Sequence, residues 1–434
     1  MSIELISILF LFASFFFLLG YGLPVAYSIG ISTTLTLLLN IPFLPAVSTV
    51  AQRMTTGIDS FALLAIPFFI LAGELMNRGG IAQRLIDFAK SLVGSLPGGL
   101  AYVNIVAAML FGAVSGSAVA ATSAIGGVMT DQMEREGYPR TFSAAVNIPS
   151  STLGLIIPPS NVLIIFALAS GGAASVEALF IAGYVPGLLV GLALMGVAAV
   201  IARRRGYGGG ERLPLVVVWR SFRAAFFSLL MLVVVVGGIV LGFFTATEAS
   251  AIAVAYALVL GFSYRTLALR DLRGILLRSS KTTAIVLFLI CTSMAMSWLF
   301  SFESIPQLMT DFLVDTVSTP WLIFLLINLT LLLFGTFMDI TPAVLIFTPI
   351  FLPVVMELGM HPIHFGMVMV LNLCIGLCTP PVGTILFVGA GVARVPVTAV
   401  IRPLLPFLGA MIVALLVVTF WEGVSLWLPG VFGL

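Results

Sequence analysis

The sequence predicts an all-α integral membrane protein built from two inverted repeats. Three observations support this prediction: an apolar composition, a one-sided placement of Lys and Arg, and short motifs that return about 222 residues later. Each repeat is expected to hold five membrane-spanning helices, one of them broken at a Pro-Pro pair. Each is also expected to hold one re-entrant hairpin, whose two short helices enter and leave the membrane on the same side.

The composition indicates that the chain lies in a lipid bilayer. Hydrophobic residues make up 61% of the 434 positions and charged residues 8%, and the mean hydropathy is +1.22. A soluble domain carries roughly 25% charged residues and could not hide this much apolar surface. Because about 20 apolar residues span a bilayer as a helix, the chain has room for ten or more crossings. Nothing in the composition suggests a nucleic-acid partner.

Ten apolar runs are interpreted as crossings, and two further stretches as hairpins. The crossings lie near 3–19, 23–39, 60–77, 141–170, 177–202, 224–242, 247–264, 283–302, 365–392 and 403–427. The hairpins lie within 91–130 and 317–356, where short apolar arms flank tips at 112–117 and 335–342. The first run lacks a basic leader, so it is interpreted as a membrane helix and not as a cleavable signal peptide.

The positive charges test this topology. If both hairpins return to the side from which they entered, 18 of the 19 Lys/Arg residues fall on one side and only Arg53 on the other. The positive-inside rule makes that side cytoplasmic, which places both termini outside. Counting either hairpin as a single crossing would invert every later loop.

Three collinear matches indicate an internal repeat. Gly154-Leu155-Ile156-Ile157-Pro158-Pro159 returns as Gly376-Leu377-Cys378-Thr379-Pro380-Pro381, an offset of 376 − 154 = 222. Phe111-Gly112 returns as Phe334-Gly335, and a spaced set beginning at Ile81 returns from Ile305. The sequence therefore divides into a first repeat at 1–205, a cytoplasmic linker at 206–222 and a second repeat at 223–434.

Five crossings are an odd number, so the second repeat is expected to be inverted. Amphipathic arms precede the hairpins at 78–95 and 303–319, the first carrying basic residues and the second only acidic ones, as opposite membrane faces require. Inverted repeats with broken helices at matching positions point to a secondary transporter whose site lies near the midplane.

The Pro-Pro breaks are the expected sites. Two prolines in mid-crossing leave backbone carbonyls and amides unpaired; carbonyls coordinate Na⁺, and the N-termini of half-helices attract carboxylates. The candidate sodium ligands are Ser115, Ser151 and Gly154 for one site, with Asn147 and Ser160 nearby, and Gly335, Thr336, Gly376 and Thr379 for the other. The candidate substrate-binding residues are Ser117, Asn161, Asp339 and Thr384. The alternative is that the prolines only kink helices and the small residues only permit close packing.

Asp339 is the only charge between Asp315 and Glu357 and lies at a hairpin tip. Intramembrane carboxylates are costly and usually functional, which favours a cation or proton ligand. An N-cap of the following helix remains the alternative. Of the other acids, Glu74 is expected to pair with Arg78, and Glu248 to begin a helix.

Enzyme and soft-metal chemistry are not expected. Cys374 and Cys378 have no His or acidic companions and are interpreted as packing residues, and neither histidine belongs to a His-Glu-x-x-His motif.

The motifs at 111–117, 154–160, 247–251 and 376–383 together resemble the large membrane subunit of tripartite ATP-independent periplasmic (TRAP) transporters, DctM-like members of the ion-transporter superfamily. The resemblance covers nearly the whole chain. One departure is Ala246, where the family has proline in its Thr-Pro-Thr-Glu-Ala motif.

The resemblance implies an elevator-type carrier in the bacterial inner membrane. Such a carrier takes up a small carboxylate, such as a C4-dicarboxylate, sialic acid or another sugar acid. It implies sodium ions as coupling ions, no covalent cofactor, and two partners: a small four-helix membrane subunit and a periplasmic substrate-binding protein. A sodium/proton antiporter or anion permease of related fold, working without a binding protein, is the alternative, and a channel is a further one.

Overall fold

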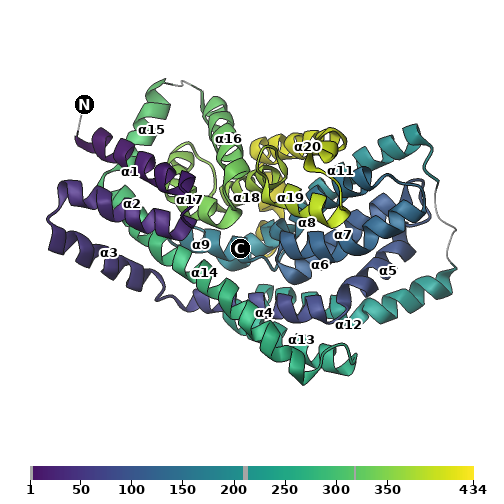
Figure 1. The fold of residues 1–434 in the computed structure, drawn as a ribbon. Coiled ribbons are helices and arrows are strands. Elements are labelled where there is room, and N and C mark those ends of the chain that lie inside the picture. Colours follow the sequence, from purple (N-terminus) through teal and green to yellow (C-terminus); the bar gives the residue numbers. More distant parts are fainter. Residues whose placement is uncertain (1–2, 209–213, 317–318) are drawn as a thin grey trace.

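The computed structural model describes residues 3–208, 214–316 and 319–434, and every regular element in these ranges is a helix (Figure 1). Eight continuous helical stretches are long and apolar enough to cross a membrane. A ninth span results when the pair 140–156 and 161–169, bent by 51°, is counted as one. The prediction of an all-α, multi-pass membrane protein is confirmed, whereas the inverted orientation and the side of the termini stay predictions.

The helices follow the expected order. The first half contains α1 (Ile3–Gly20), α2 (Val25–Asn40), α3 (Phe43–Gly57), η1 (Phe61–Leu64), α4 (Ala65–Arg78), α5 (Ile81–Val93), α6 (Gly99–Ser115), α7 (Ala118–Arg135), α8 (Arg140–Ile156), α9 (Asn161–Ala169), α10 (Val176–Ala182) and α11 (Tyr184–Arg205). The second contains α12 (Leu215–Val240), α13 (Ala246–Ser263), α14 (Leu269–Phe302), α15 (Ile305–Thr316), α16 (Pro320–Phe337), α17 (Ile340–Glu357), α18 (Pro362–Cys378), α19 (Thr384–Ala393), α20 (Val397–Phe420) and α21 (Gly423–Val431).

Two helices differ from the prediction because helix formation does not require hydrophobicity, and a third, α12, starts earlier than expected although its first residues are apolar. Helix α3 lies in a stretch taken as a loop; it buries only Ala46, Val50 and Gly57, so its apolar face is narrow. Helix α14 starts 14 residues before the expected 283, since its first turns are basic but helix-compatible. Helix α12 begins at Leu215, inside the segment 206–222 interpreted as linker, of which 209–213 lie outside the described residues.

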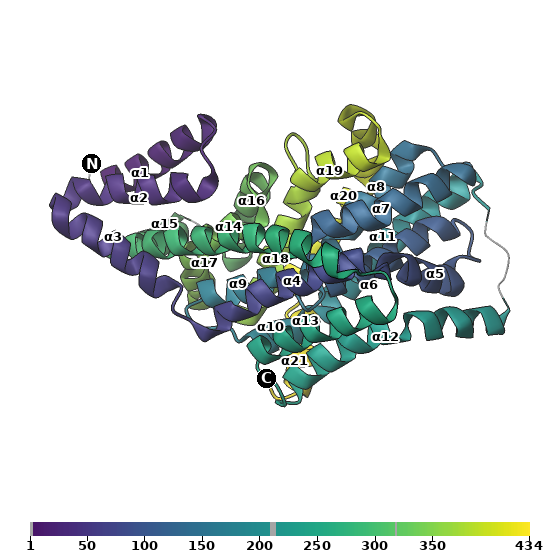
Figure 2. The same ribbon diagram turned by 60° about the horizontal axis from the view of Figure 1, so that its bottom comes forward.

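The long helix α14 runs along the molecule and packs against α2, α3, α4 and α17 (Figures 1 and 2). In both views α1, α2 and α3 project from one end, while α6 to α8 and α18 to α20 gather together away from that end. Helix α13 packs along α4, and its start is fixed by a capping box in which Thr245 and Glu248 hydrogen-bond each other's backbone. This confirms the expectation for Glu248.

Both expected hairpins consist of two helices joined by a tighter tip than expected. Helices α16 and α17 are each 18 residues long and apolar enough to cross a membrane, so the re-entrant course stays a prediction. Helices α6 and α7 are joined by Gly116 and Ser117, and α16 and α17 by Met338 and Asp339. The predicted tips at 112–117 and 335–342 were wider, because Gly112 and Gly335 were taken as chain reversals. Both glycines instead lie inside helices.

Gly112 and Gly335 allow two helices to pack at very short distance. A Cβ on Gly112 would overlap the Cα of Gly154 in α8. In the second half, a Cβ on Gly376 of α18 would lie 2.6 Å from the carbonyl carbon of Gly335. At both places the first arm of a hairpin therefore touches a broken helix backbone to backbone, which only glycine permits.

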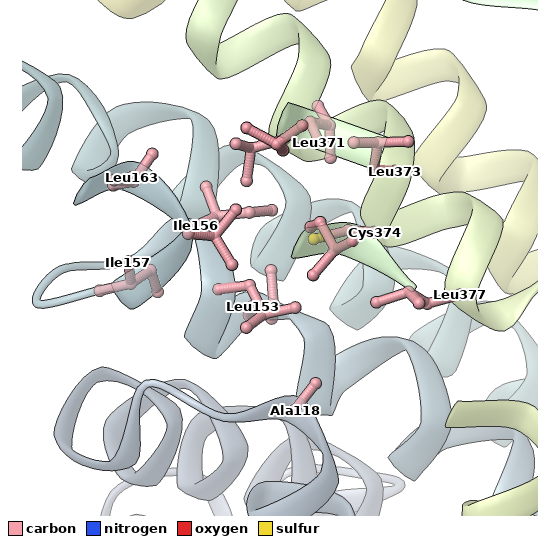
Figure 3. Close-up of a cluster of buried hydrophobic side chains, with 14 of the residues drawn as sticks. Ala118, Leu153, Ile156, Ile157, Leu163, Leu371, Leu373, Cys374 and Leu377 are labelled. Carbon is pink, nitrogen blue, oxygen red and sulfur yellow. The ribbon is translucent and has the colours of Figure 1, made fainter. Parts of the chain in front are cut away.

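The two broken helices also pack against each other, through the buried cluster of Figure 3. Leu153 and Ile156 of α8 lie beside Leu371 and Cys374 of α18, and the Cys374 thiol lies 3.7 Å from the Thr152 carbonyl oxygen. Cys374 and Thr152 are separated by 374 − 152 = 222 positions, the offset of the repeat. Contact between equivalent residues is what a twofold axis between α8 and α18 predicts.

A buried carboxylate ties α1 and α2 to the end of α14. Asn40 Nδ2 donates to Glu303 Oε1 at 2.6 Å and lies 2.8 Å from Ser7 Oγ, and Glu303 is 6% exposed. We predict that Asn40→Ala lowers the free energy of unfolding by about 1–3 kcal/mol, because the carboxylate loses its donor. Thermal unfolding measures this. Adding Glu303→Gln should recover most of the loss, and strictly additive losses would contradict the explanation.

Candidate functional site

A cavity of about 500 Å³ lies where the two hairpin tips, the first helix break, α4 and α14 meet. Its polar lining comes from five separate segments of the chain. These residues are Glu74 and Asn77, Ser115, Ser117 and Ser123, Asn161, and Thr282, Asp339 and Thr341. Four of the sequence-predicted site residues, Ser115, Ser117, Asn161 and Asp339, therefore share one cavity.

The first hairpin tip meets the first helix break. Gly116 has φ +58°, and a Cβ there would lie 3.3 Å from the Pro159 carbonyl oxygen and 3.7 Å from Asn161 Nδ2. Ser117 caps α7 by accepting a hydrogen bond from the Ala120 amide at 3.3 Å. Asn161 Oδ1 is buried and accepts no hydrogen bond. The tip thus brings backbone and side-chain oxygens to the break, as the sequence predicted.

Asp339 occupies the N-cap position of α17 but its side chain makes no capping hydrogen bond. The residue is exposed and faces the cavity. Helix α17 therefore begins without the side-chain cap that an aspartate could supply. This leaves the carboxylate available as a ligand, the first of the two interpretations of Asp339.

Three helices begin at the cavity. The first residues of α7 (Ala118), α9 (Asn161) and α17 (Ile340) all line it. The first four N–H groups of a helix have no partner within the helix, and the helix dipole is positive at this end. Three such ends directed at one cavity form an environment that suits a carboxylate.

Glu74 of α4 lines the cavity and pairs with Arg278 of α14, with 3.4 Å between Oε2 and Nε. The prediction that Glu74 pairs with Arg78 was wrong. Arg278 belongs to this helix because α14 begins at Leu269, before the expected residue 283. The earlier start brings the Arg278 guanidinium beside α4. The pair places a neutralised carboxylate, and not a free one, at this part of the cavity.

A second polar cluster lies between α7 and α8. Thr122 Oγ1 lies 2.6 Å from Ser151 Oγ, and Asn147 Nδ2 donates to the Thr122 carbonyl oxygen at 3.0 Å. Asn147 Oδ1 is buried without a hydrogen bond. Ser151 and Asn147 were predicted, and Thr122 was missed, because one threonine among small residues gives no signal in the sequence.

The second tip also meets its helix break. The Gly383 amide donates to the Thr336 carbonyl oxygen at 3.1 Å. The hydroxyls of Thr336 and Thr379 bond back within their own helices, to Leu332 and Ile375. Thr384 is exposed at the first turn of α19 and is not among the residues lining the cavity. Its neighbour Ile385 does line the cavity, so Thr384 lies next to the lining without being part of it.

The donor set consists of oxygen atoms, which suit a hard cation. In the described residues, no three His, Cys, Asp or Glu side chains gather as a transition-metal site. The available ligands are hydroxyls, carbonyls and amide oxygens, of which Asn147 Oδ1 and Asn161 Oδ1 are buried and lack donors. Sodium prefers such oxygen ligands, so both Asn oxygens are candidate ligands.

The family model "Tripartite ATP-independent periplasmic transporter, DctM component" matches residues 12–424. The chain is 51% identical to the uncharacterized protein YgiK of Salmonella typhimurium, with 98% of each chain covered. It is 43% identical to the C4-dicarboxylate TRAP transporter large permease protein DctM of Pseudomonas aeruginosa, covering 99% of this chain and all of that one. It is 38% identical to the sialic acid TRAP transporter large permease protein SiaM of Vibrio cholerae, covering 96% of each.

Among solved structures, the YdaH transporter of Alcanivorax borkumensis has a similar fold. The TM-score is 0.64 at 16% identity, over 89% of this chain and 90% of that one. At this identity the likeness concerns the fold alone.

Proposed function

Because this chain belongs to the DctM family of TRAP transporter large permeases, we propose that it carries out sodium-coupled uptake of a small carboxylate. The family is one of transporters and not of enzymes. The observation that carries the proposal is the cavity in which Ser115, Ser117, Asn161 and Asp339 meet three helix N-termini.

The substrate class follows from the charges at the cavity. Three helix N-termini attract an anion, and a carboxylate fits the unpaired amides there. One relative is named for C4-dicarboxylates and another for sialic acid, and both of these solutes contain a carboxylate group. We place a C4-dicarboxylate first, because the relative with that name is the more similar of the two.

In this proposal, sodium ions supply the positive charge that offsets the carboxylate in the cavity. The cavity also contains Asp339, whose carboxylate repels an anionic solute unless a cation neutralises it, whereas Glu74 already has Arg278 as its partner. Ions bound at Asp339, and at the cluster of Thr122, Asn147 and Ser151, would raise the affinity for the solute. The coupling must be reciprocal, so the solute would raise the affinity for sodium equally.

The proposed mechanism is an elevator. The cavity is lined by α4 and α14 on one side and by the hairpin tips and the first helix break on the other. Backbone contacts at Gly112–Gly154 and Gly335–Gly376 join each hairpin to its broken helix as one body. In this proposal that body slides along α4 and α14, while the arms α5 and α15 act as hinges.

The family description is tripartite, so we propose two partners: a small four-helix membrane subunit and a periplasmic substrate-binding protein. The complex would lie in the bacterial inner membrane with both termini of this chain on the periplasmic side. This orientation rests on the placement of 18 of the 19 Lys/Arg residues on one side.

Proteoliposomes test the proposal. They would contain this chain and its small subunit, with the binding protein added outside and a panel of labelled carboxylates. We expect uptake to require both an inward Na⁺ gradient and the binding protein. Uptake without the binding protein would instead support a permease that works alone, and uptake unaffected by Na⁺ would remove the ion sites.

A further inference from the structure

A second cleft, of about 550 Å³, lies between α8, α11 and α20, apart from the transport cavity. Helices α11 and α20 pack side by side (Figures 1 and 2). The cleft has an apolar wall and a cationic rim. The wall is formed by Phe142, Ile201, Ala399, Pro403 and Pro406, and the rim by Arg204, Arg205 and Arg402.

The three guanidinium groups have no carboxylate within the described part of the chain. The ion pairs found there join Arg140 to Asp131 and Glu134, and Arg278 to Glu74. Arg205 is held in place: its guanidinium carbon lies 5.9 Å from the centroid of Phe142, and its Nη1 lies 3.3 Å from the Tyr207 hydroxyl. Arg205 therefore presents pre-positioned positive charge at the rim.

The cleft lies where apolar helix surface gives way to charge. Helix α11 is apolar until its last turn, Arg203 to Arg205, and α20 carries Arg402 in its second turn before a long apolar stretch. Next to the cleft, Val200 is 51% and Leu405 56% exposed. Such side chains face acyl chains when the arginines are at headgroup level.

The prolines of α20 add hydrogen-bond acceptors. Pro403 and Pro406 lack the N–H groups that would bond the carbonyls of Ala399 and Arg402, four residues earlier. Ala399 and Arg402 both line the cleft. A ligand that matches this wall needs a negative phosphate for the arginines, a hydroxyl donor for the carbonyls and an apolar tail.

We propose that this cleft binds the headgroup of an anionic phospholipid of the phosphatidylglycerol class. The phosphate lies between Arg204 and Arg402, the glycerol hydroxyls donate to the freed carbonyls of α20, and the acyl chains follow Leu405. The lipid contacts α8, one of the two broken helices, so its binding stabilises that part of the fold. This inference is independent of the transported solute.

The test is a lipid titration of the purified full chain in detergent, read as the midpoint of thermal unfolding. The probes are phosphatidylglycerol, phosphatidylcholine and water-soluble glycerol 1-phosphate. Arg204→Gln/Arg402→Gln removes two rim charges. Arg203→Gln/Arg394→Gln removes two charges from the ends of α11 and α19, outside the cleft, and is the matched control.

We expect phosphatidylglycerol to raise the midpoint more than phosphatidylcholine. Its half-saturating concentration should rise at least about tenfold in the cleft variant and by less than about twofold in the control. Equal effects of the two lipids, or equal losses in the two variants, would overturn the proposal. A full shift with glycerol 1-phosphate would instead identify a site for a free anion. Should the double variant unfold in detergent alone, lipid retained by Arg402→Gln in native mass spectrometry gives the same comparison.

Discussion

Asp339→Asn is expected to raise the sodium concentration for half-maximal uptake on the order of a hundredfold, or about 2.7 kcal/mol. The substitution keeps the size of the side chain and one oxygen but removes the charge. Asp339 faces the cavity and makes no capping hydrogen bond, so its carboxylate is available to a cation. The measurement is Na⁺-dependent uptake of a labelled carboxylate in proteoliposomes with both partner proteins.

The same position distinguishes ligand from helix cap. Asparagine caps a helix as well as aspartate does, so a capping role predicts normal uptake in Asp339→Asn and a loss of about 1 kcal/mol of stability in Asp339→Ala. A ligand role predicts that both variants lose uptake while thermal unfolding changes little. Asp59→Asn, which removes an exposed carboxylate between α3 and η1, is the matched control and should transport normally.

Gly154→Ala is expected to lower the free energy of unfolding by about 1–3 kcal/mol and to abolish most uptake. Its Cβ would meet the backbone of Gly112, which no side-chain rearrangement can relieve. Separation of α6 from α8 would move the first hairpin tip away from the break at Pro158-Pro159, and with it Ser115 and Ser117. Thermal unfolding and uptake are both measured.

Gly127→Ala in α7 is the control, because a Cβ there meets nothing within 4 Å. Alanine is the better helix former, so this variant should be as stable as the parent or slightly more so. Since Gly154→Ala keeps the carbonyl that the sequence assigned to sodium, a loss of stability indicates packing. Normal unfolding with a changed sodium dependence would contradict this explanation.

Local chemistry made the individual elements predictable. The apolar runs gave the helices, because a backbone in lipid must satisfy its own hydrogen bonds. The Pro-Pro pairs gave the two breaks, at Ile157–Ser160 and Thr379–Gly383, since proline lacks the N–H that a helix needs. Helix α3 and the start of α14 were not predicted, because amphipathic and basic helices leave no hydropathy signal.

The sequence also named candidate residues that the structure brings together. The sequence singled out Ser115, Ser117, Asn161 and Asp339 because they lie at a hairpin tip or beside a Pro-Pro break, and these four line one cavity. It did not indicate that Asp339, from the second half, would join the tip and break of the first. That juxtaposition depends on how α17 packs against α9 and α14, which side-chain shapes across the whole chain determine.

The sequence by itself determined the solvent, the order of the helices, the positions of the breaks and the family, because each depends on the composition or spacing of neighbouring residues. Only the tertiary structure decided which residues far apart in the sequence contact each other. It paired Glu74 with Arg278, joined Thr122 to Ser151, and brought Arg204 and Arg402 to one cleft. These partners are far apart in the chain, and their contact is fixed by helix packing, which no local pattern encodes.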